Sequence, residues 1–184
     1  MPRYVALLRG INVGGHNKVA MADLRQVAAD LGFADVSTYI QSGNLLFTAD
    51  EDDTAQLAAV LERSIAERLG VRPVVVVISA AELGQVIADN PFPDAPNPRL
   101  VHAVFRNHDH SESGLAAIAA AVAAAQASGS RDEAEVVGRT LFLHTPDGFG
   151  RSDLAAKLTS SAAQPGGTAR NWATVTKLMA LLSA

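Results

Sequence analysis

The chain has 184 residues, of which 48% are hydrophobic and 18% charged, and its formal net charge is −4. This composition is typical of a globular protein and excludes a disordered one, and the acidic balance argues against a protein that coats nucleic acid. The sequence has no cysteine, which excludes disulfides, a thiolate nucleophile and cysteine-based metal sites. Its apolar runs are too short for a signal peptide or a membrane span, so we expect a cytoplasmic protein.

The first half of the chain is predicted to alternate short strands with amphipathic helices. Apolar residues at spacings of three and four indicate helices, and short apolar runs rich in β-branched residues indicate strands. In chain order we expect a strand at 4–8, a helix at 21–31, strands at 36–40 and 45–48, a helix at 54–69, a strand at 74–78 and a short helix from 80 to about 88. The order β-α-β-β-α-β is the ferredoxin-like pattern.

The second half repeats much of this order after a proline-rich connector. We expect a strand at 101–105, a helix at 115–127, strands at 135–137 and 140–144, a helix at 152–158, a polar loop and a final helix from 171 onwards. Each half opens with a strand that ends in arginine, and 34 positions separate Arg9 from Gly43 while 32 separate Arg106 from Gly138. This similarity indicates an internal duplication.

The predicted fold class is therefore α+β, with two ferredoxin-like βαββα(β) halves, mostly antiparallel sheets and helices on one face. The first half comprises residues 1–90, the connector 91–99, and the diverged second half 100–184, with an extra C-terminal helix. The second half is predicted to replace its last strand by helix.

Three polar segments of the first half are predicted to meet at one edge of its sheet. They are the glycine-rich loop Arg9–Lys18, the hairpin turn Gln41–Asn44 and the segment Gly70–Arg72. A glycine-rich loop that runs into a helix can bind an anion through backbone N–H groups, and arginine and lysine add charge. The loop is neither a Walker A motif nor a dinucleotide fingerprint, and glycine and asparagine also suit ordinary turns.

From this edge we predict a site for a small anionic, phosphate-bearing ligand. Its predicted ligand-binding residues are Arg9, Asn12, Gly14, Gly15, Lys18, Gln41, Ser42 and Asn44, with Arg170 and Asn171 closing the site from the second half. We assign no catalytic residue, because Ser42 would need a nearby base and only His16 lies on the same edge. Two histidines at 108 and 110 could chelate a metal, but no third ligand accompanies them, so we predict no metal and no cofactor.

Four polar motifs stand out along the chain: Leu8–Gly15 with Lys18, Tyr39–Asn44, Gly150–Ser152, and Thr168–Trp172 with Thr174 and Leu178. Together they resemble a bacterial family called domain of unknown function 1697. They follow one another in the right order from end to end of the chain. The resemblance implies a two-part α+β fold and a cytoplasmic bacterial protein, and it implies no particular activity.

Three functional hypotheses follow from the sequence. The first is a binding protein or enzyme for a small anionic ligand. The second is a nucleic-acid-binding module, against which the 5% aromatic content and the negative net charge argue. The third is a protein-interaction scaffold without catalysis.

Overall fold

The computed structural model describes residues 1–164 and 166–184, which form two compact units. The first unit contains Met1–Gly84 together with Leu178–Ala184, and the second contains Gln85–Lys177. The end of the chain thus belongs to the first unit, whereas we predicted a second half that runs from 100 to the C-terminus. Within the described residues, no helix is long and apolar enough to cross a membrane.

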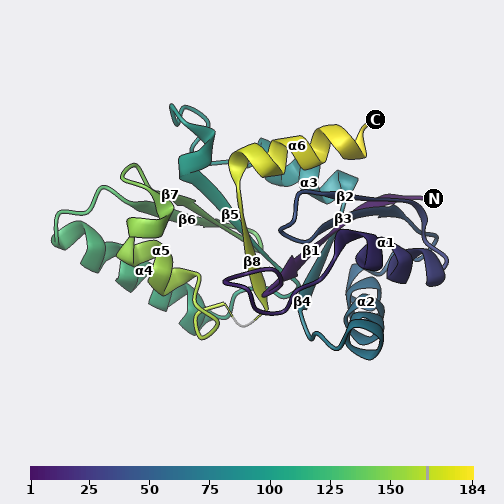
Figure 1. Ribbon diagram of the computed structural model, residues 1–184. Coiled ribbons are helices and arrows are strands. Elements are labelled where there is room, and N and C mark those ends of the chain that lie inside the picture. The colour runs from purple at the N-terminus through teal and green to yellow at the C-terminus, as the bar shows by residue number, and fades with distance from the viewer. Residues whose placement is uncertain (165) are drawn as a thin grey trace. The chain divides into compact units, whose positions relative to one another are not determined.

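The first unit is built on a four-stranded antiparallel sheet with the strand order β2-β3-β1-β4 (Figure 1). Its elements are β1 (Arg3–Arg9), α1 (Met21–Asp30), β2 (Ala34–Tyr39), β3 (Asn44–Thr48), α2 (Thr54–Leu69), β4 (Val74–Ser79) and α3 (Ala80–Ala88). Every element predicted for this half is confirmed, with ends that differ by two residues at most. β1 is central, because it pairs with both β3 and β4.

Local signals explain where several of these helices begin and end. The carboxylate of Asp53 accepts hydrogen bonds from two N–H groups in the first turn of α2, and Gly70 ends that helix at φ +68°. Ser79 and Glu82 cap α3 reciprocally: the serine hydroxyl accepts from the Glu82 N–H, and the glutamate accepts from the Ser79 N–H.

Both faces of the first sheet are covered, which corrects the prediction that the helices lie on one face. Each residue of Tyr4–Leu8 in β1 is at most 2% exposed, and successive side chains of a strand point to opposite faces. One face packs on α1 and α2, and Figure 1 shows α3 and the end of α6 (Trp172–Leu182) on the other. There the Arg3 guanidinium donates to the carbonyl of Leu182 at 3.1 Å, and Met179 lies against Gly84.

The second unit has an equivalent antiparallel sheet, with the strand order β6-β7-β5-β8. Its elements before α6 are the short helix η1 (Pro98–Leu100), β5 (Val101–Arg106), α4 (Glu112–Ala127), β6 (Glu133–Val137), β7 (Thr140–His144), the short helix η2 (Phe149–Arg151), α5 (Asp153–Leu158) and β8 (Gly167–Asn171). Both units thus place their first strand between the third and the last, so the two halves are similar.

Strand β8 corrects the prediction that the second half replaces its last strand by helix. β8 pairs antiparallel with β5, with Gly167 opposite Arg106 and Asn171 opposite His102. Its sequence, Gly-Thr-Ala-Arg-Asn, has no run of large apolar residues, so local pattern does not reveal it. Pairing with the central strand supplies the backbone hydrogen bonds that the segment needs. Pro165, in the polar loop predicted before it, lies outside the described residues.

Candidate functional site

The glycine-rich loop and the hairpin turn of the first unit meet at one edge of the sheet, as predicted. The N–H of Leu8, near the end of β1, donates to the carbonyl of Gly43 in the turn at 2.8 Å. Arg9 lies opposite Val74, the first residue of β4, so the segment that follows Gly70 enters the sheet at the same edge. We call the loop 9–18 together with the turn 40–44 the glycine-rich edge.

Hydrogen bonds of the Asn12 side chain join the loop and the turn of the glycine-rich edge. Its side-chain amide donates to the carbonyl of Val19 at 3.0 Å and to the carbonyl of Gln41 at 2.9 Å. Its side-chain oxygen accepts from the N–H of Val19 at 2.9 Å. The side chain that we predicted as a ligand contact is therefore engaged within the protein, and it fixes the shape of the edge.

The backbone of the glycine-rich edge departs from ordinary strand and helix conformations. Positive φ angles occur at Gly10, Asn12, Gly14, Gly15, Asn17, Ile40 and Gly43. Ile40, at φ +51°, is the notable one, because a β-branched side chain is strained in this region. Asn17 adds an internal contact by donating to the carbonyl of Gly10 at 2.8 Å. The positive φ angles and the internal hydrogen bonds thus give the edge a defined backbone conformation.

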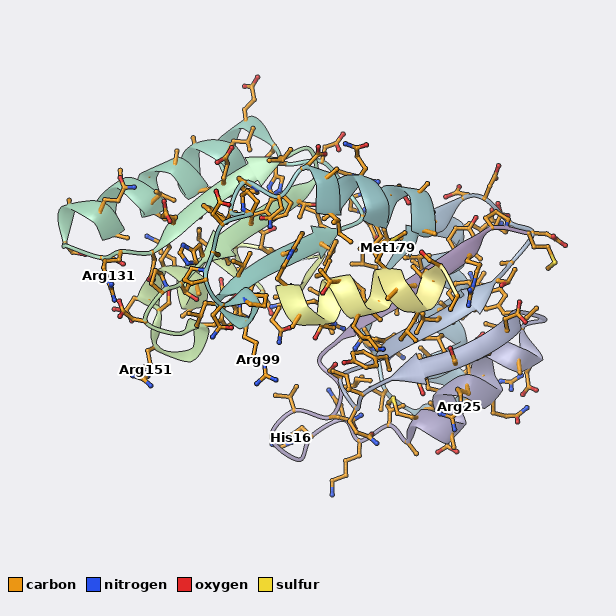
Figure 2. The ribbon with its side chains drawn as sticks, turned by 90° about the horizontal axis from the view of Figure 1, so that it is seen from above. His16, Arg25, Arg99, Arg131, Arg151 and Met179 are labelled. Carbon is orange, nitrogen blue, oxygen red and sulfur yellow. The ribbon has the colours of Figure 1, made fainter. Side chains whose placement is uncertain are left out.

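The polar groups of the edge differ in how far they are available to a ligand. Asn44 is fully buried, and its amide donates to the carbonyl of Tyr39 and to the hydroxyl of Ser42. Arg9 is half-buried, whereas Lys18, Gln41 and Ser42 are exposed. Figure 2 shows His16, another exposed residue, at the tip of the loop. Lys18 is therefore the cation on this edge that an anion reaches most readily.

Helix α1, which follows the loop directly, begins without a side-chain cap. Ala20 occupies the N-cap position and offers no side-chain oxygen to the first turn. Each of the other α-helices in the described residues begins with a capping side chain, from Asp53, Ser79, Ser111, Ser152 and Asn171. The uncapped start is a feature that our sequence reasoning missed, although an alanine where a serine or aspartate usually stands was a readable signal.

Arg170 and Asn171 lie in β8 of the second unit. Arg170 is 8% exposed and donates to the Thr168 hydroxyl and to the Ala169 carbonyl, each at 2.8 Å. Burial lowers the pKa of Arg170 to about 10, so the guanidinium stays charged at neutral pH. Asn171 caps α6 by accepting from the N–H of Thr174 at 2.9 Å. Their part in a site on the first unit stays a prediction.

Replacing Asn12 by aspartate tests the fastening role without changing the shape of the side chain. The introduced carboxylate keeps an acceptor for Val19 but has neither N–H donor, and it faces two carbonyl oxygens with a negative charge. We expect N12D to lower the free energy of unfolding by about 1–3 kcal/mol, since two hydrogen bonds are lost and water replaces the exposed one of them, to Gln41, only in part. Urea denaturation measures this loss, and Asn17→Asp, which removes one such donor, should cost less.

The fold and the glycine-rich edge together define an α+β protein of two similar four-stranded units, with a preorganised polar loop on the first. A family model described as a protein of unknown function (DUF1697) matches residues 1–142, and the chain belongs to this family. The resemblance found in the sequence is thereby confirmed.

Several solved chains match this protein, and one of them is similar over nearly the whole length of both chains. It is a conserved bacterial protein from Streptococcus pneumoniae that is 26% identical, with a TM-score of 0.73 and 98% of each chain covered. None of the curated proteins matches the chain.

Proposed function

We propose that this protein binds a small anionic, phosphate-bearing ligand at the glycine-rich edge of its first unit. The observation that carries the proposal is the uncapped start of α1, directly after a fastened loop that presents Lys18. The first N–H groups of a helix have no intrahelical acceptor, and the helix dipole adds partial positive charge there. A phosphate oxygen would accept from these N–H groups while Lys18 supplies the opposite charge.

The internal contacts of Asn12 favour tight binding because they hold the loop before the ligand arrives. Three hydrogen bonds of the Asn12 side chain already join the loop to the turn and to Val19, two residues before α1. A ligand therefore spends little of its interaction energy on ordering the backbone. We assign the direct contacts to Lys18, Arg9, Gln41 and the backbone of Gly14 and Gly15, and a supporting role to Asn12 and Asn44.

We further propose that the two units are diverged copies of one ferredoxin-like half. The matching strand orders of the two sheets support this proposal. An arginine at the end of the first strand of each unit, Arg9 or Arg106, supports it as well. We expect the protein to act in the cytoplasm, where small phosphorylated molecules are abundant.

A thermal-shift screen tests the anion proposal. Nucleotides, phosphorylated sugars and inorganic phosphate would be added to the wild type, to Lys18→Gln and to Lys177→Gln, which removes an exposed lysine on α6. A ligand at about 100 times its Kd stabilises the native state by about 2.7 kcal/mol. We expect Lys18→Gln to weaken binding about tenfold, as for loss of one charge-assisted hydrogen bond, and Lys177→Gln to leave it unchanged.

No shift with any anion in a protein that melts cooperatively would contradict the proposal. A short oligonucleotide that binds with a steep salt dependence would favour the nucleic-acid alternative instead.

One observation favours the protein-interaction alternative. Val13 and Ile40, both on the glycine-rich edge, are 67% and 51% exposed. Exposed apolar side chains are typical of interaction sites when they form a continuous patch. If this edge binds a protein, Val13→Asp should abolish the association seen by light scattering, while binding of small anions would be absent.

A further inference from the structure

A cavity of about 360 Å³ lies in the second unit, where β5 ends and α4 begins. It occupies the edge that corresponds to the glycine-rich edge, because the two sheets have the same strand order and Arg106 ends β5 as Arg9 ends β1. Its volume falls in the range of pockets for small molecules rather than for a single ion.

The lining of this cavity combines cationic and polar side chains with apolar ones, and we call the apolar part, from Ala117, Ile118 and Leu158, its apolar floor. Among the described residues that line it none is acidic, although Asp109 and Glu112 lie nearby in the chain. The polar lining comes from Arg106, His110, Ser111, Ser113, Lys157 and Gln164. In a protein whose net charge is −4, a lining with two cations, Arg106 and Lys157, and no acidic residue favours an anion over a cation in this cavity.

Arg106 is held in place by two side chains that lie far apart in the sequence. One terminal nitrogen, Nη1, lies 2.7 Å from Nδ1 of His110 and 3.3 Å from the side-chain oxygen of Gln164. A guanidinium only donates hydrogen bonds, so His110 accepts through Nδ1 and is neutral. Burial lowers the pKa of His110 and the charge of Arg106 lowers it further, while the Arg139 backbone and Asp109 act in the opposite direction.

The guanidinium of Arg106 is not saturated by these contacts. Its Nε is buried and has no hydrogen-bond partner within residues 1–164 and 166–184. Because Arg106 lines the cavity, its positive charge favours an anionic acceptor there, although the Nε–H itself is shielded from solvent. Lys157, at the end of α5, is exposed and lines the same cavity, so it provides a second cation.

In each unit a side-chain-to-backbone hydrogen bond joins the loop after the first strand to the neighbouring hairpin, but the donor lies on opposite sides in the two units. The Arg139 side chain in the hairpin between β6 and β7 donates to the carbonyl of Asn107 in the loop after β5 at 3.2 Å. In the first unit, Asn12 in the loop donates to Gln41 in the turn. The loop that carries His110 is therefore held against its neighbouring hairpin.

From these observations we propose that the cavity is a second ligand site, which binds a small organic phosphate. The phosphate group of this ligand lies between Arg106 and Lys157, and the apolar part of the ligand lies on Ile118 and Leu158. A phosphate group matches the two cations because guanidinium and ammonium groups both donate to its oxygens. The apolar floor distinguishes this ligand from inorganic phosphate, which offers nothing to bury there. The site is independent of the glycine-rich edge, because all its residues belong to the second unit.

The test uses phenyl phosphate, inorganic phosphate and phenol as probes in a ¹H–¹⁵N NMR titration of the full chain. We expect phenyl phosphate to shift the amide signals of Ser113, Gly114 and Ile118 saturably and to bind more tightly than inorganic phosphate. Phenol at the same concentrations should leave these signals unchanged. Lys157→Gln should weaken phenyl phosphate binding about tenfold, whereas Lys177→Gln should have no effect. Arg106→Lys should retain more affinity than Arg106→Gln.

Four outcomes would overturn the proposal. The first is the absence of shifts at these amides, and the second is an equal effect of the Lys157 and Lys177 substitutions. The third is equal affinity for inorganic phosphate and phenyl phosphate, which would leave the apolar floor without a role. Shifts confined to residues 9–18 would also overturn this site while supporting the site on the first unit, so the two failures are distinguishable.

Discussion

Replacing Gly43 by alanine is expected to destabilise the protein by about 2–5 kcal/mol. A Cβ at this position would lie 2.8 Å from Cβ of Leu8 and 2.8 Å from Cδ1 of Ile11, closer than side chains approach without displacement. In addition, φ at Gly43 is +76°, a conformation that costs any residue with a Cβ about 1–2 kcal/mol. The steric clash and the backbone strain add to each other, because the turn packs directly against the end of β1.

Gly32→Ala is the matched control for this substitution. Gly32 has φ +83°, but a Cβ there would meet nothing within 4 Å. The control therefore isolates the backbone strain, and we expect it to cost only about 1–2 kcal/mol. Urea denaturation of both variants measures the difference. Equal losses at the two positions would contradict the close approach of the turn to β1.

Replacing His102 by phenylalanine is expected to make the protein less sensitive to acid. His102 lies in β5, stacked on Phe149 with ring centroids 3.9 Å apart, and burial lowers its pKa to about 4. In the unfolded chain a histidine has a pKa of about 6.5. Below that pH, the histidine binds a proton in the unfolded state, whereas His102 in the native state stays neutral. The contribution to stability is complete above about pH 6.5 and is lost as the pH falls toward 4.

The expected loss follows from this difference in pKa. Because part of the ring is accessible to solvent, we expect the neutral histidine to cost the wild type about 1–2 kcal/mol at about pH 5 relative to neutral pH. His102→Phe removes this pH-dependent loss of stability. It also removes Nδ1, which is buried without a hydrogen-bond partner in the described part of the chain.

The measurement is the free energy of unfolding in urea between about pH 4.5 and 7.5 for the wild type and the variant. Their difference isolates His102 from the carboxylates, which titrate in both proteins. His108→Phe, at an exposed position in the loop after β5, serves as the control. If the wild type and His102→Phe lose stability in parallel as the pH falls, the ring is solvated rather than buried.

Much of the candidate site on the first unit could be predicted from the sequence. The β-α-β-β-α-β order alone brings the loop after β1 and the turn before β3 to one edge, and the structure brings them together. The sequence did not reveal which polar side chains remain available. Asn12 and Asn44 look like ligand contacts in the sequence, but both side chains are engaged within the protein.

The cavity of the second unit escaped sequence reasoning for a different reason. Arg106 and Gln164 are 58 positions apart, and only the pairing of β5 with β8 brings their segments together. The histidine at 110 was considered only as a metal ligand. The one signal that pointed to this edge was the match between Arg106 and Arg9 at the ends of equivalent strands.

The sequence by itself determined the helices and strands whose signals are local. The periodicity of α2, its capping residue Asp53 and its closing glycine each act over about one helical turn, so they can be read without knowing the tertiary partners. Only the tertiary structure decided β8, the coverage of both faces of the first sheet, and the return of the chain's last residues to the first unit. These features depend on partners far away in the sequence, and a segment as polar as β8 becomes a strand only because β5 satisfies its backbone hydrogen bonds.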